Sequence, residues 1–416
     1  MNIIFVLLMS FSVGLGYCAA EANKLPHNIQ NECILNLHHS YADPGGIEMH
    51  LLLLNKFFLQ HGIKNFVLTS NRSTWLKQTL DQQGDGCEAF DHDGFPTEVD
   101  IMLQCLKHPV TTIICNFPIH VYLSHQVKKA LQGQRDIKIV FVVHDTLYEY
   151  SPQFIAMLNH VDGVVTVNYA MAETAKALAK QGVLVPKNIE WIAPFWDDLK
   201  FLHFVTQQER RAFFKGAYGI DVPNTCPVIT MIANFWPYKN HDVLLHAIAQ
   251  LRTRRGKEFK VILAGDGQER AAIEGLAQSL QLQNCVYFLG SVSNVAELLH
   301  HSTLHLLSSG LPDRVRGYAE SFGIVYLEAA LMKKPFLGAS GVGIIPLVNE
   351  GVTDFAGLRG LSFASGDVQS LADMLEFLLD HPAVCQKMGE NAYNFVKQEF
   401  LSEAIFNKWA RFLNGL

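Results

Sequence analysis

Apolar runs and stretches with helical periodicity alternate along most of the chain. Five apolar runs have the length of a strand: 33–38, 65–70, 109–117, 137–145 and 163–168. Apolar residues recur at helical spacing between or after these runs, in 47–62, 122–133 and 169–182. Continuously apolar strands that alternate with helices are typical of a parallel sheet covered by helices on both faces.

The pattern changes after Trp196, where the segment 196–220 is polar and helical. A second series of strand-like runs follows, each before a plausible helix: 227–235, 260–267, 286–290, 304–309 and 335–340. We therefore predict an α/β protein with two doubly wound, Rossmann-like domains that face each other across a cleft. The 416 residues suffice for two hydrophobic cores.

The predicted domain boundaries follow from this alternation. An N-terminal domain is expected over 31–195 and a C-terminal domain over 222–385. A last helix, at roughly 386–414, is expected to pack back toward the N-terminal domain.

The first 20 residues form a separate segment. They are mostly apolar and end in Ala19 and Ala20, as a secretory signal with a small-residue cleavage site does. The segment has no Lys or Arg, and its apolar run is near the lower length limit for a membrane span. We predict that residues 1–20 are a signal peptide or a membrane anchor.

Composition and charge exclude some classes of function. The net charge of −6 gives no basic surface for nucleic acid. The 18 histidines show no metal-ligand spacing, and the 8 cysteines include no C-x-x-C pair, so we expect no metal site. Cys115 ends an apolar run and is expected to be a buried thiol. The sequence Asp91-His92-Asp93 is interpreted as a solvated turn.

Loops that follow strands are the places to look for a binding site, because open α/β sheets bind ligands beyond the carboxyl ends of their strands. Gly45 and Gly46 open a helix after the first strand, where backbone amides can approach a phosphate or a sugar; a plain tight turn is the alternative. His144 follows a fully apolar strand, and its imidazole could bond a substrate hydroxyl. We interpret Asp145 as a helix cap.

Two further loops belong to the second domain. Lys239 follows that domain's first strand and could neutralise a diphosphate, although an ordinary surface lysine would look the same. Glu320 and Glu328 flank Gly323. On a single helix they would lie about 80° apart, as the polar edge of an amphipathic helix. Alternatively, a helix begins at Gly323 and the amides of Phe322, Gly323 and Ile324 bind an anion between the two carboxylates.

The stretch 320–329, ESFGIVYLEA, resembles the glutamate–seven–glutamate motif of retaining GT-B glycosyltransferases of glycosyltransferase family 4 (glycosyl transferases group 1). VILAGDGQER (261–270), VYFLGSVSNVAELL (286–299) and GLSFASGDVQSLADML (360–375) resemble that family's second domain in register. PGGIE (44–48) and HD (144–145) are similar to its first domain. The resemblance extends over nearly all of residues 32–385.

The resemblance implies a role for each residue at the site. Gly45 and Gly46 would line the donor site, and His144 would contact the donor sugar. Lys239 and the amides around Phe322 and Gly323 would bind the diphosphate. Glu320 would hold sugar hydroxyls and Glu328 the nucleoside ribose. The donor would be a nucleotide-diphosphate sugar and the acceptor a sugar, a lipid-linked molecule or a protein, with no cofactor and no metal.

The chain departs from the family pattern at four points. The arginine expected five residues before Lys239 is Asn234, the usual Asn-Gly after the interdomain strand is replaced within 192–198, and a paired glycine is Ile344. The loop 311–319 resembles an insertion, and its Arg314 or Arg316 could restore the lost positive charge.

These departures keep other hypotheses open. The fold could bind a sugar or a nucleotide without turnover, or it could serve a nucleotide-sugar epimerase or a phosphorylase. A dehydrogenase is disfavoured, because the GDG sequence at 265–267 lacks the third glycine of the dinucleotide fingerprint. Nucleotide sugars are made in the cytoplasm, so we expect the enzyme at the cytoplasmic face of a membrane, with export as the alternative.

Overall fold

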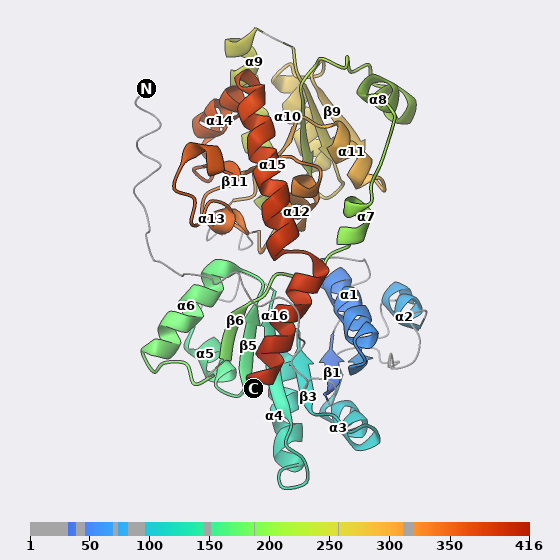
Figure 1. Ribbon diagram of the computed structural model, residues 1–416, viewed down its shortest axis with the longest axis vertical. Helices are drawn as coiled ribbons and strands as arrows, with labels where there is room; N and C mark the ends of the chain where they lie inside the picture. The colour runs from blue at the N-terminus through green and yellow to red at the C-terminus, as the bar shows by residue number, and fades with distance from the viewer. Residues whose placement is uncertain are drawn as a thin grey trace.

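The computed structural model describes residues 32–38, 46–69, 74–81, 96–144, 151–186, 188–256, 258–310 and 320–416. Two α/β halves lie one above the other in Figure 1, and the chain crosses between them twice. The C-terminal helix returns to the half that holds the first sheet. This confirms the predicted fold class of two Rossmann-like domains.

The first domain is built on one parallel sheet with the strand order β2-β1-β3-β4-β5-β6. The strands are β1 (Cys33–Leu37), β2 (Lys64–Leu68), β3 (Thr112–Cys115), β4 (Lys138–Val143), β5 (Gly163–Thr166) and β6 (Asn188–Trp191). The five predicted runs form β1 to β5, whose residues are almost all buried. The sixth strand is partly exposed and does not stand out as an apolar run.

Helices cover this sheet. They are α1 (Gly46–Gln60), α2 (Thr74–Asp81), α3 (Glu98–Lys107), α4 (Pro118–Ala130), α5 (Pro152–Leu158) and α6 (Tyr169–Lys180). Capping residues determine where two of these helices begin. Thr97 and Asp100 form a capping box before α3, and the side chain of Asn168 caps α6.

The second domain has a parallel sheet in the order β10-β7-β8-β9, beside a β11-β12 pair. The strands are β7 (Val228–Ile232), β8 (Lys260–Ala264), β9 (Val286–Gly290), β10 (Leu304–His305), β11 (Phe336–Ala339) and β12 (Gly360–Phe363). An isolated bridge from Leu307 to Gly338 attaches the pair next to β10.

The helices around this sheet are α9 (His241–Arg255), α10 (Arg270–Ser279), α11 (Val295–His301), α12 (Ile324–Leu331), α13 (Ile345–Val348) and α14 (Val368–Asp380). The predicted strand 304–309 is only two residues long as β10. Beyond it the chain turns toward η3 (Pro237–Lys239), and the Ser308 hydroxyl donates to the carbonyls of Lys239 and Asn240. Backbone pairing continues to Leu307, and side-chain bonds at the loop replace the expected ladder after it.

The end of the chain forms two helices, α15 (Pro382–Glu399) and α16 (Ser402–Asn414), so the prediction of one helix over 386–414 is wrong. The linker between the domains causes the break. The indole Nε1 of Trp196 donates to the carbonyl of Phe400 at 2.7 Å, and Asp198 accepts from the amide of Ser402 at 2.5 Å. These partners satisfy the polar groups that the two helix ends leave free.

The linker itself carries α7 (Asp198–Leu202) and α8 (Arg210–Tyr218). From the break, α16 crosses to the first domain, where its Trp409 packs edge-on against Phe58. The ring of Phe412 lies so close to Gly163 of β5 that a Cβ there would be 2.6 Å from it. The two domains are thus joined by the linker and by a helix that belongs to the end of the chain.

Candidate active site

The candidate residues follow the carboxyl ends of strands in both domains. His144 comes directly after β4, and Lys239 ends η3, the turn that follows β7. Glu320 precedes α12, the helix whose start is marked by Gly323. This is the edge at which open α/β sheets bind their ligands.

Lys239 and Glu320 form an ion pair between their Nζ and Oε2 atoms. Both side chains are close to fully buried, with exposed fractions of 12% and 11%. Burial by itself lowers the pKa of Lys239, but the Glu320 carboxylate, aided by Tyr238, raises this pKa above its usual value. The Ser309 hydroxyl also donates to Oε2 of Glu320, at 3.0 Å. The pair therefore holds two full charges at the edge of the sheet.

The start of α12 has the geometry of an anion site. Gly323 caps the helix at φ 85°, a conformation that favours glycine, and a Cβ there would lie 2.7 Å from the ring of Tyr326. The amides of Phe322, Gly323 and Ile324 donate to no other residue in the described part of the chain. Free amides at a helix start attract negative charge. The Phe322 side chain is buried, so any contact by this residue to a ligand comes from its backbone.

Glu328 lies on α12, whereas Glu320 precedes that helix. The two glutamates therefore do not form one polar edge of a single helix. Burial raises the pKa of Glu328 to about 7, an effect that Lys200 opposes and Asp197 reinforces. Both neighbours belong to the start of α7 in the linker. Glu328 thus lies where the second domain meets the linker.

His144 is buried at the edge of the first sheet, with 9% of its surface exposed. Its Nε2 lies 2.8 Å from Oδ1 of Asn116, which follows β3. Burial, followed by the neighbouring His50 and His38, holds the pKa of His144 well below its usual value. The imidazole is therefore neutral at physiological pH.

Helix α1 contributes two of the side chains around His144, His50 and Glu48. The rings of His50 and His144 are 5.4 Å apart between centroids and meet edge to face. Nδ1 of His50 accepts from the amide of Phe195, 2.8 Å away in the linker, and burial lowers the pKa of His50 to about 3. His38 faces Glu48 at 3.3 Å.

Asn168 connects the two halves of the site. Its Oδ1 caps α6 by accepting from the amide of Met171, and its Nδ2 donates to the carbonyl of Ser321 at 3.1 Å. Ser321 is next to Glu320, and Asn168 follows β5, the strand that pairs with β4. This bond therefore holds the loop with Glu320 against the sheet edge that carries His144.

Several predicted residues lie outside the described residues: Gly45, Asp145, Arg314, Arg316 and the Asp91-His92-Asp93 turn. Gly46 begins α1, and Asn234 is exposed in the loop after β7. Sequence reasoning missed Asn116, Asn168 and Ser309. Each is the last or next-to-last residue of a predicted strand run, the position that could have identified it.

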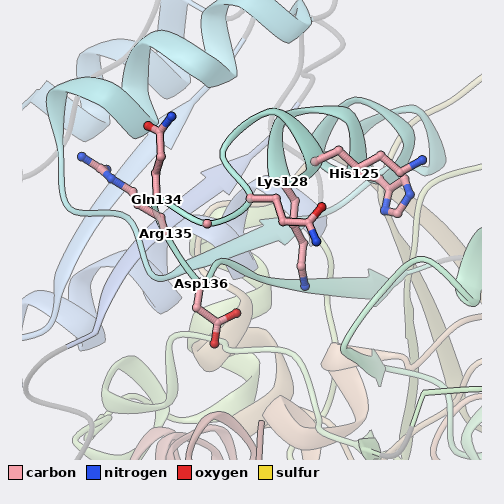
Figure 2. A pocket seen from close by; sticks show the side chains of 8 residues that line it. His125, Lys128, Gln134, Arg135 and Asp136 are labelled. Atoms are coloured by element: carbon pink, nitrogen blue, oxygen red, sulfur yellow. The ribbon is translucent and has the colours of Figure 1, made fainter.

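A separate hollow of about 640 Å³ lies at the opposite edge of the first sheet, between the end of α4 and the start of β4 (Figure 2). Its Lys128 is paired with Asp162 at 2.7 Å, and Arg135 donates to the carbonyl of His108 at 2.5 Å. These cations already have partners within the protein, and the hollow lies away from the carboxyl ends of the strands.

Two further findings apply to the described residues only. Nowhere among them do three or more His, Cys, Asp or Glu side chains gather as a metal ion would require. None of the helices in this part of the chain is both long and apolar enough to cross a membrane. Residues 1–20 lie outside it, so the signal or anchor stays a prediction.

The family model for glycosyl transferases group 1 matches residues 219–395, which hold Lys239, Glu320 and Glu328. These residues therefore form a glycosyl transferases group 1 domain. The N-acetyl-alpha-D-glucosaminyl L-malate synthase of Bacillus anthracis is 29% identical over 303 residues, 70% of this chain and 72% of that protein. The alpha-D-kanosaminyltransferase of Streptomyces kanamyceticus is 30% identical over 189 residues, 44% of each chain.

Solved structures agree on the fold. HepE of Anabaena in complex with UDP superposes with a TM-score of 0.74 at 20% identity, over 92% of this chain and 100% of that one. A glycosyltransferase of Rickettsia africae superposes with a TM-score of 0.74 at 17% identity, over 92% and 97%. The solved structures show the GT-B fold, and the matched domain and the relatives in sequence support glycosyltransferase activity.

Proposed function

We propose that this glycosyltransferase is a retaining enzyme of family 4, which moves a sugar from a nucleotide-diphosphate sugar to an acceptor hydroxyl. The observation that carries the proposal is the buried Lys239–Glu320 pair beside the start of α12. It combines a cation for phosphate, a carboxylate for sugar hydroxyls and helix-start amides that have no partner among the described residues.

The diphosphate end of the donor fits the second domain. An ammonium group has three N–H donors, and Glu320 occupies one donor of Lys239, so the others can reach phosphate oxygens. The amides near Gly323 add neutral donors and the positive end of the helix dipole. UDP is the ligand in the HepE complex, a fold relative of this chain.

The two ends of the donor differ in chemistry, and so do the residues proposed to bind them. Glu320 is a hydrogen-bond acceptor suited to sugar hydroxyls, and His144 would contact the sugar from the first domain. Glu328, near the linker, would accept from the ribose diol. Two relatives are named for different products, one as an N-acetyl-alpha-D-glucosaminyl L-malate synthase and the other as an alpha-D-kanosaminyltransferase.

The proposed chemistry needs no side-chain nucleophile, cofactor or metal. The acceptor hydroxyl attacks from the face of the leaving group, and the departing phosphate takes the proton. The protein then contributes positioning and stabilisation of the charge that develops on the leaving diphosphate. Lys239 and the α12 amides would supply that stabilisation.

Asn234 stands where a second cation is expected, and Arg314 or Arg316 would supply the missing charge. Because both arginines lie outside the described residues, this part of the proposal rests on sequence alone. If Arg314→Ala and Arg316→Ala transfer sugar as fast as wild type, the compensation is wrong.

The test is incubation of the full chain with a panel of nucleotide sugars and simple acceptors, with and without EDTA. Release of nucleoside diphosphate is scored, and NMR gives the anomeric configuration of the product. We expect release with at least one donor, retention of configuration and no loss with EDTA. Inversion would refute the retaining mechanism. Nucleotide binding without release would instead favour the non-catalytic alternative.

A further inference from the structure

The side chain of Asn116 has only one orientation that satisfies both of its contacts. Its Nδ2 donates to the carbonyl of Leu37 at 2.9 Å, and its Oδ1 lies 2.8 Å from Nε2 of His144. A flipped amide would place two acceptors against each other at Leu37, because a carbonyl oxygen cannot donate. The backbone of β1 therefore decides which atom of Asn116 faces His144.

This orientation also decides where the proton of His144 lies. An amide oxygen only accepts, so Nε2 of His144 must carry the hydrogen. A neutral imidazole carries one N–H, and its other nitrogen is then an acceptor. In the described part of the chain, Nδ1 of His144 has no hydrogen-bond partner, and the residue keeps 9% of its surface exposed.

We propose that Asn116 is a positioning residue, which fixes His144 in the Nε2–H tautomer so that Nδ1 accepts a hydrogen bond from a hydroxyl of the donor sugar. The proposal rests on the proposed function for the identity of the ligand. The tautomer itself follows from the contacts of Leu37, Asn116 and His144.

The groups around His144 keep this tautomer in the neutral form. From α1, His50 faces the ring and Glu48 pairs with His38, which follows β1. His50 accepts from the amide of Phe195 through Nδ1, so it carries its own proton on Nε2. Asn168 follows the neighbouring strand β5, and its side chain is an uncharged amide. A second proton on His144 would place a cation in a buried cluster of imidazoles, and burial with these neighbours lowers its pKa.

The discriminating variant is Asn116→Asp. An aspartate keeps the shape of the side chain and an acceptor oxygen toward His144, although it loses the N–H that donates to the carbonyl of Leu37. Its negative charge favours imidazolium and raises the pKa of His144. Below that raised pKa, both ring nitrogens are donors and Nδ1 can no longer accept. We expect the kcat/KM of Asn116→Asp, divided by that of wild type at the same pH, to fall from about pH 8 toward pH 6.

Two other variants complete the series. Asn116→Ala removes the acceptor and lets both tautomers form, for which we expect a loss of about 2- to 10-fold in kcat/KM without a change in the pH profile. Asn65→Ala is the matched control, since Asn65 is a buried amide of the same domain bonded to Asn55 and not to His144. It should lower stability and leave the pH profile unchanged.

A measurement that needs no activity separates this inference from the proposed function. Protein labelled with ¹⁵N-histidine reports the protonated ring nitrogen of each residue, and the signal of His144 is identified by its loss in His144→Gln. We expect an Nε2–H signal in wild type and imidazolium character in Asn116→Asp as the pH falls. An Nδ1–H signal in wild type overturns the inference even if transfer occurs. A pH profile of Asn116→Asp identical to wild type overturns it as well.

Discussion

Each domain buries one polar side chain of the candidate site near the end of a strand, but one of these side chains is neutral and the other is charged. In the first domain, His144 is kept neutral by burial and by imidazole neighbours, and its proton is located by an amide. In the second domain, Lys239 is equally enclosed but keeps its charge, because Glu320 compensates for burial. One side offers neutral hydrogen bonds and the other offers full charge.

This difference matches the two ends of the proposed donor. Sugar hydroxyls are neutral and are recognised by directed hydrogen bonds, whereas a diphosphate is recognised by charge and by free amides. A full charge on His144 would cost desolvation without a partner, whereas the charge of Glu320, which would also contact the sugar, is balanced by Lys239. A neutral phosphate side would leave the leaving group unstabilised. The following variants test that division, from the largest expected effect to the smallest.

Lys239→Met should have the largest effect. It removes the cation and leaves the carboxylate of Glu320 buried without its partner, so we expect kcat/KM to fall by about 100- to 1000-fold. Lys260→Met is the control, since Lys260 is also buried and is paired with Glu258 at 2.9 Å. Lys260 begins β8, so it lies at the amino end of the strands, away from the candidate site. Steady-state kinetics that show equal losses in both variants would mean that Lys239 has only a structural role.

Glu320→Gln should separate chemistry from binding. The amide keeps the shape but weakens the hydrogen bonds to the sugar, and we expect kcat to fall by about 10- to 100-fold. Lys239 would be freed for phosphate, so the Kd for nucleoside diphosphate should stay the same or tighten. Calorimetry checks the Kd. A Kd that rises as much as kcat falls would contradict the assignment of Glu320 to the sugar.

Glu328→Gln should change the pH dependence of nucleotide binding. With a pKa of about 7, Glu328 is mostly protonated below that pH and is a carboxylate above it. Acceptance from a ribose diol therefore strengthens as pH rises. We expect a Kd about 10-fold weaker than wild type at pH 8 and little changed at pH 6. A constant ratio between the two proteins across this range would argue against a ribose contact.

The raised pKa of Glu328 also affects the free energy of unfolding. The folded chain holds the proton of Glu328 more tightly than the unfolded chain, whose reference pKa is 4.5. The free energy of unfolding should therefore decline as pH rises from about 4.5 to about 7. Glu328→Gln should flatten this decline, as denaturant titrations at several pH values would show.

Asn168→Asp should have the smallest effect on transfer. Aspartate still caps α6 but has no N–H for the carbonyl of Ser321, so the loop with Glu320 loses its bond to the first domain. We expect a melting temperature close to wild type and a loss of about 2- to 10-fold in kcat/KM. Asn168→Ser, which also keeps a capping oxygen, is the control for helix stability. Full activity in Asn168→Asp would show that this contact does not position Glu320.

The sequence predicts the fold well, for a physical reason. Strands such as 137–145 and 260–267 are buried on both faces of a parallel sheet, so their apolar runs are unbroken. The break between α15 and α16 could not be predicted, because both halves have helical periodicity. It is imposed by Trp196 and Asp198, about 200 residues earlier in the chain.

In the site, too, local patterns can be predicted from the sequence and long-range contacts cannot. A glycine with positive φ at 323 and carboxylates on either side of it are visible as a local pattern. The partners of those residues are not. The pairing of Lys239 with Glu320 and the contact of Asn168 with Ser321 join residues 81 and 153 positions apart. Nothing in the local sequence marks Asn116 as the residue that places the proton of His144.

The most direct test of the account compares two Kd values in two variants, for free nucleoside diphosphate and for the intact donor that the panel identifies. Lys239→Met should weaken the binding of both ligands to a similar extent, since both carry the diphosphate. His144→Gln should weaken only the binding of the intact donor, since only that ligand carries the sugar. An equal loss of affinity for both ligands in His144→Gln would contradict the assignment of His144 to the sugar and of Lys239 to the diphosphate.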